Sequence, residues 1–512
     1  MEKEVRVRFA PSPTGPLHIG GVRTALYNYL FAKRHNGKFI LRIEDTDQTR
    51  FVEGAEEYIR ESMEWLGIVP DEGQGYGGEF GPYKQSERTE IYQKYAKQLI
   101  DEGKAYYAFD TPEELEAMRE RLTEARVLHP QYNALTRNTM KNSLTLSDEE
   151  VKQKIEAGEP HVVRLKVPRK EDIRFKDAVR DWVLVNTDTL DDKVLMKSDG
   201  LPTYHLANIV DDHLMEITHV IRGEEWLPSA PIHVLLYEYL GWDAPTFCHL
   251  PLLLKPNGNG KLSKRDGDKH GYPVFPLDWQ APDSKEKSMG FREQGYLPDA
   301  MVNFLALLGW NPGDNREMFT LEELVENFSL DRIIKGGAKF DIQKGQWFNQ
   351  QYLKNTTNQE LAVFLLKDLN SKGIECSQEK AEKICNALKE RVTFPNEFSV
   401  KGDFFFEAPQ AYDEKVIRKK WTQEAVDTLR AYAEALAAFE GEFSAEKAKE
   451  ILNEVLEKLG VKIGRIMQAL RVSISGSGSG ADLMEILDIL GKEETARRIN
   501  DAIEKLAGQV KA

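Results

Sequence analysis

At 512 residues the chain is too long for a single hydrophobic core, so we expect several domains. Its composition, with 41% hydrophobic and 30% charged residues, is ordinary for a soluble protein. The net charge of −15 argues against nucleic-acid binding unless Lys and Arg gather on one face, because local basic charge is what binds phosphate backbones.

The cysteines and the apolar segments argue against further classes of protein. Cys248, Cys376 and Cys385 stand apart without a CxxC spacing, which argues against a disulfide framework or a structural zinc site and fits a reducing compartment. The most apolar stretch, residues 301–310, is too short to cross a bilayer, and no apolar leader follows Met1. We therefore expect a cytoplasmic protein.

The first hundred residues alternate between strand and helix patterns. Residues 5–10 and 38–43 have the pattern of strands, and residues 22–35 have the spacing of an amphipathic helix. Such a unit is expected to be a right-handed parallel crossover. Because ligands bind beyond the carboxyl ends of parallel strands, residues 8–12 and 44–47 should lie at one rim, beside His18.

The middle of the chain changes character twice. Residues 83–197 consist mainly of charged helical patterns, with strand-like runs at 161–167 and 183–185. Apolar, β-rich character returns at 204–210 and 218–221. We interpret the middle segment as an insertion between two halves of one nucleotide-binding fold.

The last part of the chain is predicted to be helical. Residues 267–291, rich in Pro and charge, predict a surface loop. The Ser-Gly run at 475–480 predicts a flexible connection and nothing more. Amphipathic helices are expected at 378–389, 423–439, 445–459 and 481–490.

Two segments far apart in the sequence together describe one phosphate site. Residues 11–21, Pro-Ser-Pro-Thr-Gly-Pro-Leu-His-Ile-Gly-Gly, lie between a strand and a helix start, where backbone N–H groups and the helix dipole favour an anion. Residues 261–265, Lys-Leu-Ser-Lys-Arg, lie in a loop flanked by glycines and carry three cations. Either segment alone has an ordinary structural explanation. Together, in this order, they predict chemistry on a nucleotide phosphate.

Each part of this site has a physical role. A neutral His18 imidazole, with the backbone of Gly20 and Gly21, would hold an ATP phosphate. The three cations of residues 261–265 would neutralise charge that develops on the α-phosphate and on the pyrophosphate leaving group.

Five polar residues predict a small acidic substrate. Glu44 ends an apolar strand, where its carboxylate could pair with an ammonium group or cap the next turn. Arg8 and Arg222 each lie near the end of a strand-like run, and an arginine fork matches a carboxylate bidentately. Tyr204 and Asn208 would complete such a site. Each arginine alone could equally be structural.

With these residues in view, the chain resembles the class I aminoacyl-tRNA synthetases, in particular the bacterial-type glutamyl-tRNA synthetases. Residues 9–21 resemble the family's version of the HIGH motif, with Gly21 in the last position instead of His. Residues 42–47 match its RIEDTD string, and residues 261–265 match its KMSKS motif. Further matches lie at 197–200, 204–208 and 222–226. The resemblance covers essentially the whole chain.

The resemblance implies a multidomain α/β plus all-α protein: a Rossmann-type nucleotide-binding catalytic domain with an α/β insertion, followed by a helical anticodon-binding region. The implied parts are 1–84 and 198–252 for the two Rossmann halves, 85–197 for the inserted acceptor-end-binding domain, 253–340 for a stem-contact region with the basic loop, and 341–512 for the anticodon-binding region. The helical tail favours the glutamyl branch over the glutaminyl branch, which carries a β-barrel there. Residues 267–291 are longer than the usual pattern.

The resemblance also assigns roles by position. Glutamate would be held by Arg8, Ala10, Ser12, Glu44, Tyr204, Asn208 and Arg222. ATP would be held by His18, Gly20, Gly21, Glu225, Trp226, Lys261, Leu262, Ser263 and Lys264, and the catalytic set is His18, Gly20, Gly21, Lys261, Lys264 and Arg265. Mg²⁺ would bridge the phosphates without protein ligands, and no zinc is expected because residues 98–130 lack cysteine.

The implied reaction has two steps, carried out by a monomer. The glutamate carboxylate attacks the α-phosphorus of ATP, giving glutamyl-adenylate and pyrophosphate. The terminal ribose hydroxyl of tRNA(Glu) then attacks the activated carbonyl and releases AMP. Activation is expected to require bound tRNA. Glutamine would leave the charges of Arg8 and Arg222 unpaired, so it should be rejected by about 10⁴ or more without editing.

Several alternatives stay open at this point. The enzyme could charge tRNA(Gln) as well, although Arg391 falls where the family places a discriminating arginine. Truncated relatives that glutamylate a modified base lack the helical tail. A non-catalytic RNA-binding relative would have lost the phosphate-binding residues. A nucleotidylyltransferase for a small metabolite shares the glycine loop but leaves the helical third without a role.

Overall fold

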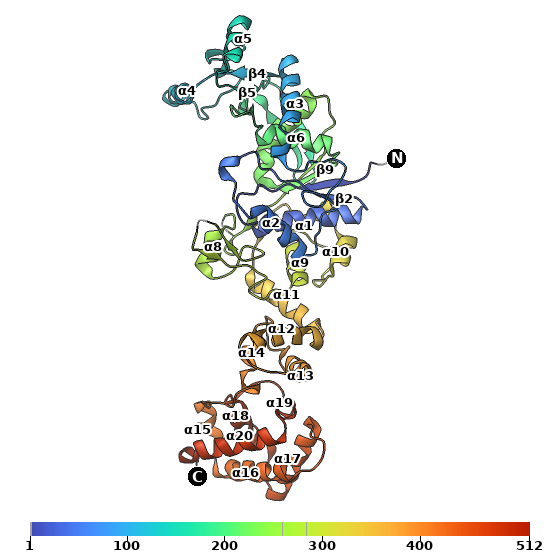
Figure 1. The fold of residues 1–512 in the computed structure, drawn as a ribbon, viewed down its shortest axis with the longest axis vertical. Helices are drawn as coiled ribbons and strands as arrows, with labels where there is room; N and C mark the ends of the chain where they lie inside the picture. Colours follow the sequence, from blue (N-terminus) through green and yellow to red (C-terminus); the bar gives the residue numbers. More distant parts are fainter. Residues whose placement is uncertain (1–2, 259, 283, 512) are drawn as a thin grey trace. The chain divides into compact units, whose positions relative to one another are not determined.

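The computed structural model describes residues 3–258, 260–282 and 284–511, and the chain forms two compact units (Figure 1). The first unit comprises the chain up to Gln294 together with Met301–Ile342. The second comprises Gly295–Ala300 and the chain from Gln343 onward.

A parallel sheet lies at the centre of the first unit. β1 and β2 pair in parallel, with Arg6 opposite Lys38 and Phe9 opposite Leu41, and α1 connects them. This confirms the strand–helix–strand unit that the sequence predicts. β3 extends the sheet beside β2. The elements are β1 (Arg6–Phe9), α1 (Ile19–Arg34), β2 (Lys38–Leu41), α2 (Ala55–Trp65) and β3 (Glu72–Gly73).

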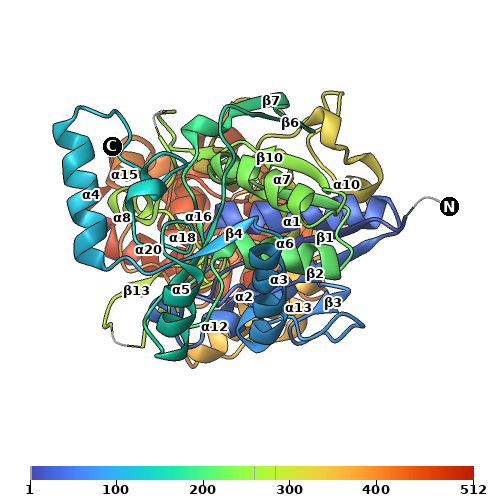
Figure 2. The same ribbon diagram turned by 90° about the horizontal axis from the view of Figure 1, so that it is seen from above.

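The second half of the fold continues this sheet on the other side of β1. The Thr218 N–H donates to the Arg6 carbonyl (2.9 Å), and β9 then pairs in parallel with β10. α1 packs against β1, β2 and β9 (Figure 2). β1 and β9 thus lie side by side and bring the two parallel sheets together. The elements are α6 (Tyr204–Leu214), β9 (His219–Gly223), α7 (Ala230–Tyr239) and β10 (Thr246–Leu250).

Residues 204–210, expected to be β-rich, are helical. They form most of α6, in which Leu206, Ile209 and Val210 are buried. α6 packs against both α3 and α7, so its apolar residues occupy more than one face. A short apolar run that contains β-branched residues cannot be distinguished from a buried strand by its pattern alone.

The inserted segment has an antiparallel sheet of its own, in which β5 lies between β4 and β8. A small core of Tyr106, Met118, Tyr132 and Met140 joins this sheet to α4. The elements are α3 (Thr89–Asp101), β4 (Ala105–Ala108), α4 (Pro112–Glu124), α5 (Asp148–Glu156), β5 (Val162–Leu165) and β8 (Val194–Met196).

A β-hairpin within the predicted insertion belongs instead to the parallel sheet. β6 (Asp172–Asp177) lies beside β10, with Asp177 opposite Phe247, and β7 (Asp181–Asn186) pairs with β6 in antiparallel. The nucleotide-binding sheet therefore recruits residues well before 198, the predicted start of its second half. The pairing joins distant segments, which no local sequence pattern reveals.

The segment with the basic loop is more ordered than expected. Within residues 267–291, predicted to be a surface loop, Val274, Phe275, Leu277 and Phe291 are buried. The Ile19 N–H donates to the Val274 carbonyl (2.9 Å), which ties this segment to the start of α1. The elements are β11 (Leu253–Leu254), α8 (Lys264–His270), β12 (Trp279–Gln280), β13 (Lys287–Ser288), α9 (Pro298–Ala306), α10 (Leu321–Asn327) and β14 (Ala338–Lys339).

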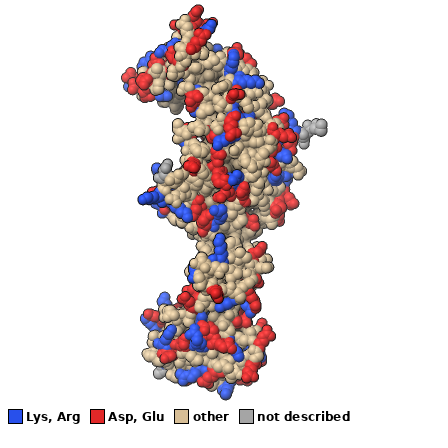
Figure 3. Space-filling view, viewed as in Figure 1, with Lys and Arg blue, Asp and Glu red and all other residues tan. Residues whose placement is uncertain are grey.

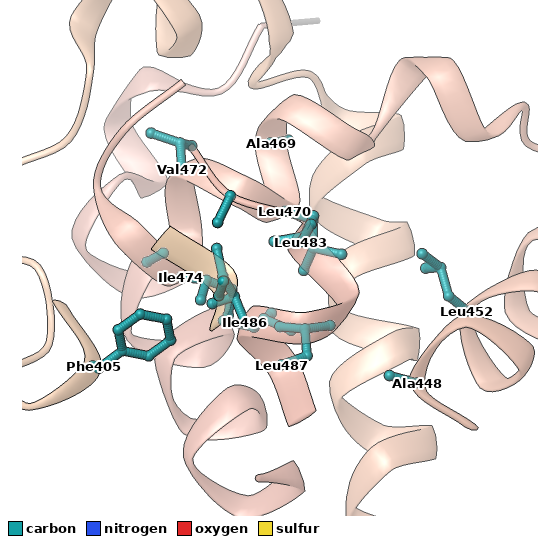
Figure 4. Packing of buried hydrophobic residues seen from close by; sticks show 14 of the residues in the cluster. Phe405, Ala448, Leu452, Ala469, Leu470, Val472, Ile474, Leu483, Ile486 and Leu487 are labelled. Carbon is teal, nitrogen blue, oxygen red and sulfur yellow. The ribbon is translucent and has the colours of Figure 1, made fainter. Parts of the chain in front are cut away.

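The second unit is built of helices, as predicted. α13, α16 and α17 match the predicted helices to within one residue, whereas α19 begins at Leu483 because Asp482 caps it. Figure 4 shows side chains of α18 and α19 packed together in the core of this unit. The helices are α11 (Ile342–Asn355), α12 (Asn358–Ser371), α13 (Gln378–Leu388), α14 (Glu397–Lys401), α15 (Glu414–Lys420), α16 (Gln423–Ala438), α17 (Ala445–Leu459), α18 (Met467–Ser475), α19 (Leu483–Leu490) and α20 (Lys492–Lys505).

The Ser-Gly run at 475–480 is more than a flexible connection. The Asp413 N–H donates to the Gly476 carbonyl (2.8 Å), and Gly476 has a φ of +73°. A Cβ at Gly476 would lie 2.6 Å from the Ala411 carbonyl oxygen. Glycine is needed here because the run packs closely against the loop before α15.

The one face of the molecule that Figure 3 shows carries charges of both signs. On the face shown in Figure 3, Lys and Arg side chains are interspersed with Asp and Glu. In the described part of the chain no helix is long and apolar enough to cross a membrane.

Candidate active site

One cavity of about 1100 Å³ collects most of the predicted site residues. It opens at the carboxyl ends of β1 and β9, where the sheet topology predicts ligand binding. Ser263 and Arg265 are not among its lining residues, and Arg391 is an exposed residue of the second unit. The predicted residues that do line it are Arg8, Ala10, Ser12, His18, Gly20, Gly21, Glu44, Tyr204, Asn208, Arg222, Glu225, Trp226, Lys261, Leu262 and Lys264.

His18 is the N-cap of α1 and is held in one orientation. Its Nδ1 accepts a hydrogen bond from the Gly20 N–H (3.1 Å), so the ring proton must lie on Nε2. Within the described residues, no group is hydrogen-bonded to this buried Nε2. Burial, together with the nearby Lys261 charge, lowers the His18 pKa to about 4. His18 is therefore a neutral donor on the cavity wall.

A side chain at Gly21 would crowd its neighbours. A Cβ there would lie 2.7 Å from Leu17 Cδ1, so the Leu17 side chain would have to shift, and 3.8 Å from the Phe9 ring. Gly20 and Gly21 both line the cavity.

Arg8 is fixed by a buried carboxylate on α6. Its Nε and Nη2 donate to Asp212 Oδ1 (3.0 Å) and Oδ2 (3.3 Å). Arg42 Nη1 donates to the same Oδ1 (2.7 Å). Burial opposes ionisation of Asp212, but the attraction of Arg8 and Arg42 outweighs it and lowers the Asp212 pKa. The guanidinium of Arg8 is thus held rigidly at the cavity wall.

Glu44 is buried beside this pair and also lines the cavity. Its Oε1 accepts from Arg42 Nη2 (3.0 Å) and Asn208 Nδ2 (3.1 Å). Burial raises the Glu44 pKa, and the charges of Arg42 and Arg8 offset only part of that effect. Asn208 therefore orients Glu44 as well as lining the cavity.

Arg222 is surrounded by neutral acceptors. Its Nη1 donates to Tyr204 Oη (2.8 Å), and its Nε donates to His249 Nε2 (3.0 Å). Its Nη2 is buried, and no residue in the described part of the chain accepts a hydrogen bond from it. The Tyr204 ring lies 4.2 Å from the Trp226 ring, centroid to centroid. An unpartnered guanidinium nitrogen at a cavity wall suits an anionic ligand.

The basic loop forms a more exposed wall. Lys261 Nζ lies 2.7 Å from Glu225 Oε1, with more than half of the lysine side chain exposed. Burial opposes ionisation of Glu225, but the hydrogen bond from Lys261 prevails and lowers the Glu225 pKa. Ser263 caps α8 through Asp266, which leaves its role structural in this conformation.

A second buried carboxylate joins the insertion to the catalytic sheet. Asp211 accepts from Arg88 Nε (2.7 Å), Gln85 Nε2 (2.9 Å) and Tyr92 Oη (2.8 Å). With Asp212 it connects α6 to β1, β2 and the start of α3. Sequence reasoning missed both residues, although two adjacent acids at the end of an apolar run signal buried ion pairs.

Two further residues were also missed. Asp177 and His249 are fully buried and lie behind Arg222. The position of His249 could have indicated its role. It lies near the end of β10, and β10 pairs with β9, the strand that carries Arg222.

Among residues 3–258, 260–282 and 284–511, no group of three or more His, Cys, Asp or Glu side chains is arranged to hold a metal ion.

The fold and the cavity together define the class of protein. Residues 4–347 match the family of the class I tRNA synthetase catalytic domain for glutamate and glutamine (E and Q). Residues 355–503 match an anticodon-binding domain. The chain is a class I aminoacyl-tRNA synthetase.

Relatives that match over their full length identify the branch of this class to which the chain belongs. The chain is 60% identical over 510 residues to the glutamate–tRNA ligase of Cytophaga hutchinsonii, covering 99% of both chains. It is 55% identical to that of Bacteroides fragilis, again over 99% of both. The crystal structure of a glutamate–tRNA ligase from Elizabethkingia meningosepticum, in complex with its amino acid, matches with a TM-score of 0.95 at 52% identity, over 98% of this chain and all of that one. The chain therefore belongs to the glutamate–tRNA ligases.

Proposed function

We propose that the cavity binds glutamate and ATP side by side and forms glutamyl-adenylate, which then acylates tRNA(Glu). The observation that carries this proposal is that two residues lining one cavity, Arg222 and His18, each have a buried donor without a partner, Nη2 and Nε2 respectively. One lies where an acidic side chain would bind and the other beside a helix start suited to phosphate.

The amino-acid end would recognise glutamate through opposite charges. Arg222, with Arg8 beside it, would bind the side-chain carboxylate, and Tyr204 would line that pocket. Glu44 would pair with the substrate ammonium, and Asn208 keeps Glu44 in place (3.1 Å). Ala10 and Ser12 would contact the substrate from the glycine loop.

The phosphate end would bind ATP. His18 Nε2 would donate to a phosphate at the positive end of α1. Gly20 and Gly21, whose own N–H groups donate to His18, would let the phosphate approach the backbone closely. Lys261, Lys264 and Arg265 would close over the α-phosphate and the leaving pyrophosphate, with Leu262 and Ser263 shaping the loop. Glu225 and Trp226 would contact the rest of the nucleotide.

Each step balances without a covalent enzyme intermediate. An oxygen of the glutamate α-carboxylate attacks the α-phosphorus, and the bond to the pyrophosphate oxygen breaks as the cations stabilise its charge. The tRNA terminal hydroxyl then attacks the carbonyl carbon, loses its proton and displaces AMP. Mg²⁺, when bound with ATP, would supply charge neutralisation on the phosphate oxygens.

Glutamine would be rejected on charge. Its neutral amide cannot neutralise the buried guanidiniums of Arg8 and Arg222 and would oppose donor to donor at Arg222 Nη2. Sites built on such polar contacts discriminate by about 10⁴ or more. This accounts for specificity at the amino acid without an editing step.

The helical unit would read the anticodon through Arg391. Arg391 is exposed in the turn after α13. We expect Arg391→Gln to increase charging of tRNA(Gln), because one contact selective for the glutamate anticodon is lost. Arg418→Gln, an exposed arginine of α15 paired with Glu414, is the control. Unchanged tRNA specificity in Arg391→Gln would contradict the assignment.

The direct test is charging of separate tRNA(Glu) and tRNA(Gln) transcripts with labelled glutamate and Mg-ATP. Charging of tRNA(Glu) alone would support a discriminating enzyme, and charging of both would indicate one that relies on later amidation. Failure with both, and with modified native tRNA, would contradict the proposal. We place this activity in the cytoplasm and in a monomer, and size-exclusion chromatography with light scattering checks the latter.

A further inference from the structure

Arg222 differs from Arg8, another buried arginine of the cavity, in how it is held. Arg8 forms a direct ion pair with Asp212 (3.0 Å). Arg222 instead contacts Tyr204 Oη (2.8 Å), His233 Nδ1 (3.2 Å) and His249 Nε2 (3.0 Å), all uncharged acceptors. No carboxylate in the described part of the chain is ion-paired with it.

His249 links the Asp177 carboxylate to Arg222, so that the carboxylate orients the guanidinium through the imidazole. An arginine Nε–H can only donate, so His249 Nε2 must accept and its proton must lie on Nδ1. That Nδ1–H donates to Asp177 Oδ2 at 2.6 Å. Asp177 and His249 side chains are both fully buried. The carboxylate therefore fixes the imidazole tautomer, and the imidazole fixes the guanidinium.

Asp177 is itself held by the hairpin turn. Its Oδ1 accepts from the N–H groups of Val179 (2.9 Å) and Arg180 (2.8 Å), between β6 and β7. The His249 N–H lies 3.2 Å from Oδ2. These contacts give each oxygen of Asp177 a defined neighbour.

We propose that Asp177 and His249 are positioning residues that aim Arg222 Nη2 into the cavity and thereby set the preference for a carboxylate over an amide. The inference rests on the proposed binding of the glutamate side chain by Arg222. Placing the carboxylate one imidazole away orients the guanidinium without pairing it directly. The direct ionic partner of Arg222 is then the substrate.

Asp177→Asn tests the tautomer. The asparagine oxygen would continue to accept hydrogen bonds from the Val179 and Arg180 N–H groups. Its NH₂ group would then take the position of Oδ2 and donate to His249 Nδ1. His249 would then carry its proton on Nε2, opposite the Arg222 Nε–H, and the two donors would separate. We expect the glutamate KM to rise about 10–100-fold, with the KM for ATP unchanged and discrimination against glutamine reduced.

His249 gives a second, independent pair of variants. His249→Gln can keep an acceptor near the Nε2 position, whereas His249→Leu removes it at similar volume. We expect the leucine variant to match Asp177→Asn and the glutamine variant to recover much of the glutamate KM. This pair decides the question if Asp177→Asn does not fold.

Asp192→Asn is the matched control for loss of a buried carboxylate. Asp192 is fully buried and accepts from Tyr106 Oη (2.6 Å) and Arg137 Nη1 (3.0 Å), away from Arg222. Asp192→Asn should lower the melting temperature of the protein. In charging assays at saturating tRNA, it should not raise the glutamate KM selectively.

The outcomes separate this inference from the proposed function. If Arg222→Gln leaves the glutamate KM unchanged, the proposed binding role of Arg222 fails, and the inference fails with it. If Arg222→Gln raises that KM but Asp177→Asn and His249→Leu do not, the positioning role alone is overturned. Equal rises in the KM for glutamate and ATP, as from general damage, would overturn it too.

Discussion

The two ends of the cavity are built in opposite ways. At the end proposed to bind the amino acid, Arg8, Arg42, Glu44 and Asp212 are all less than 10% exposed and are hydrogen-bonded to one another. At the phosphate end Lys261, Lys264 and Arg265 are exposed, and the pair of Lys261 with Glu225 can exchange with solvent. One end is preorganised before substrate arrives, and the other keeps its cations free to move.

This difference fits the two tasks. Selecting one amino acid requires charges whose direction is fixed, because a mobile guanidinium could adapt to an amide. Stabilising charge that develops on a leaving group requires cations that approach as the reaction proceeds. Exposure weakens an ion pair in water, so Lys261 can leave Glu225 at little cost.

The largest expected effect is at the buried end. Arg222→Gln should lower kcat/KM for glutamate by about 10³-fold, because a buried charge partner of the substrate is lost. The loss for glutamine should be much smaller. Steady-state charging with both amino acids measures this, with Arg174→Gln on the exposed side of β6 as control. Equal losses for both amino acids would show that the buried end does not select by charge.

At the exposed end Lys264→Ala should lower the rate of adenylate formation about 10²-fold. The glutamate KM should stay within about twofold of the wild type, since Lys264 does not belong to the buried network. Lys269→Ala, an exposed lysine on the same helix that does not line the cavity, should be silent. Rapid-quench kinetics with tRNA present measure the rate of adenylate formation and the glutamate KM separately. A glutamate KM that changes together with the rate would contradict the division of roles between the two ends of the cavity.

Salt concentration should affect tRNA binding at the surface more strongly than it affects glutamate binding to buried residues. Raising salt from about 50 to 200 mM should weaken tRNA binding about tenfold or more, because phosphate contacts release counterions. The glutamate KM at saturating tRNA should change less than about twofold, because its arginines are buried. Fluorescence titration and charging assays measure these. A flat plot of log Kd for tRNA against log salt would mean that no localised basic surface binds it.

The smallest effect concerns pH and the buried imidazoles. Burial lowers the pKa of His205 to about 4, with a smaller contribution from Lys193. An unfolded histidine takes up a proton below about pH 6.5, so stability present above that pH is lost as pH falls towards 4. We expect the melting temperature to be lower at pH 5 than at pH 7.

Substituting His205 should remove part of that pH dependence. At pH 5 its contribution is about 1–2 kcal/mol, so His205→Gln should narrow the difference in melting temperature by a few degrees. His270→Gln, an exposed histidine at the phosphate end, should leave the difference unchanged. Identical pH profiles for the wild type and His205→Gln would refute this account.

Local patterns predicted the first part of the site well. A strand, a glycine loop and a helix start all lie within residues 6–19, and His18 lies at the helix cap as expected. The basic loop was predicted from its cationic residues. In the structure Lys261 and Lys264 line the same cavity as His18.

Long-range pairing could not be predicted. Nothing near Asp177 in the sequence shows that its strand will lie beside β10, or that His249 will stand between it and Arg222. The helix α6 was misread because its short apolar run, with the β-branched Ile209 and Val210, has the composition of a buried strand. Asp177 and His249 therefore escaped notice, whereas most of the residues that were predicted for the site line the cavity.

The adjacent carboxylates of α6 have a consequence for synthesis of the chain. Asp212 follows Arg8 by 204 residues, and Asp211 follows Arg88 by 123. At about 5–20 residues per second, Arg8 leaves the ribosome about 10–40 s before Asp212. During that interval the nascent first half lacks the acids that its arginines require. We expect it to stay loosely packed on the ribosome until α6 emerges, when the catalytic sheet and the start of the insertion become ordered together.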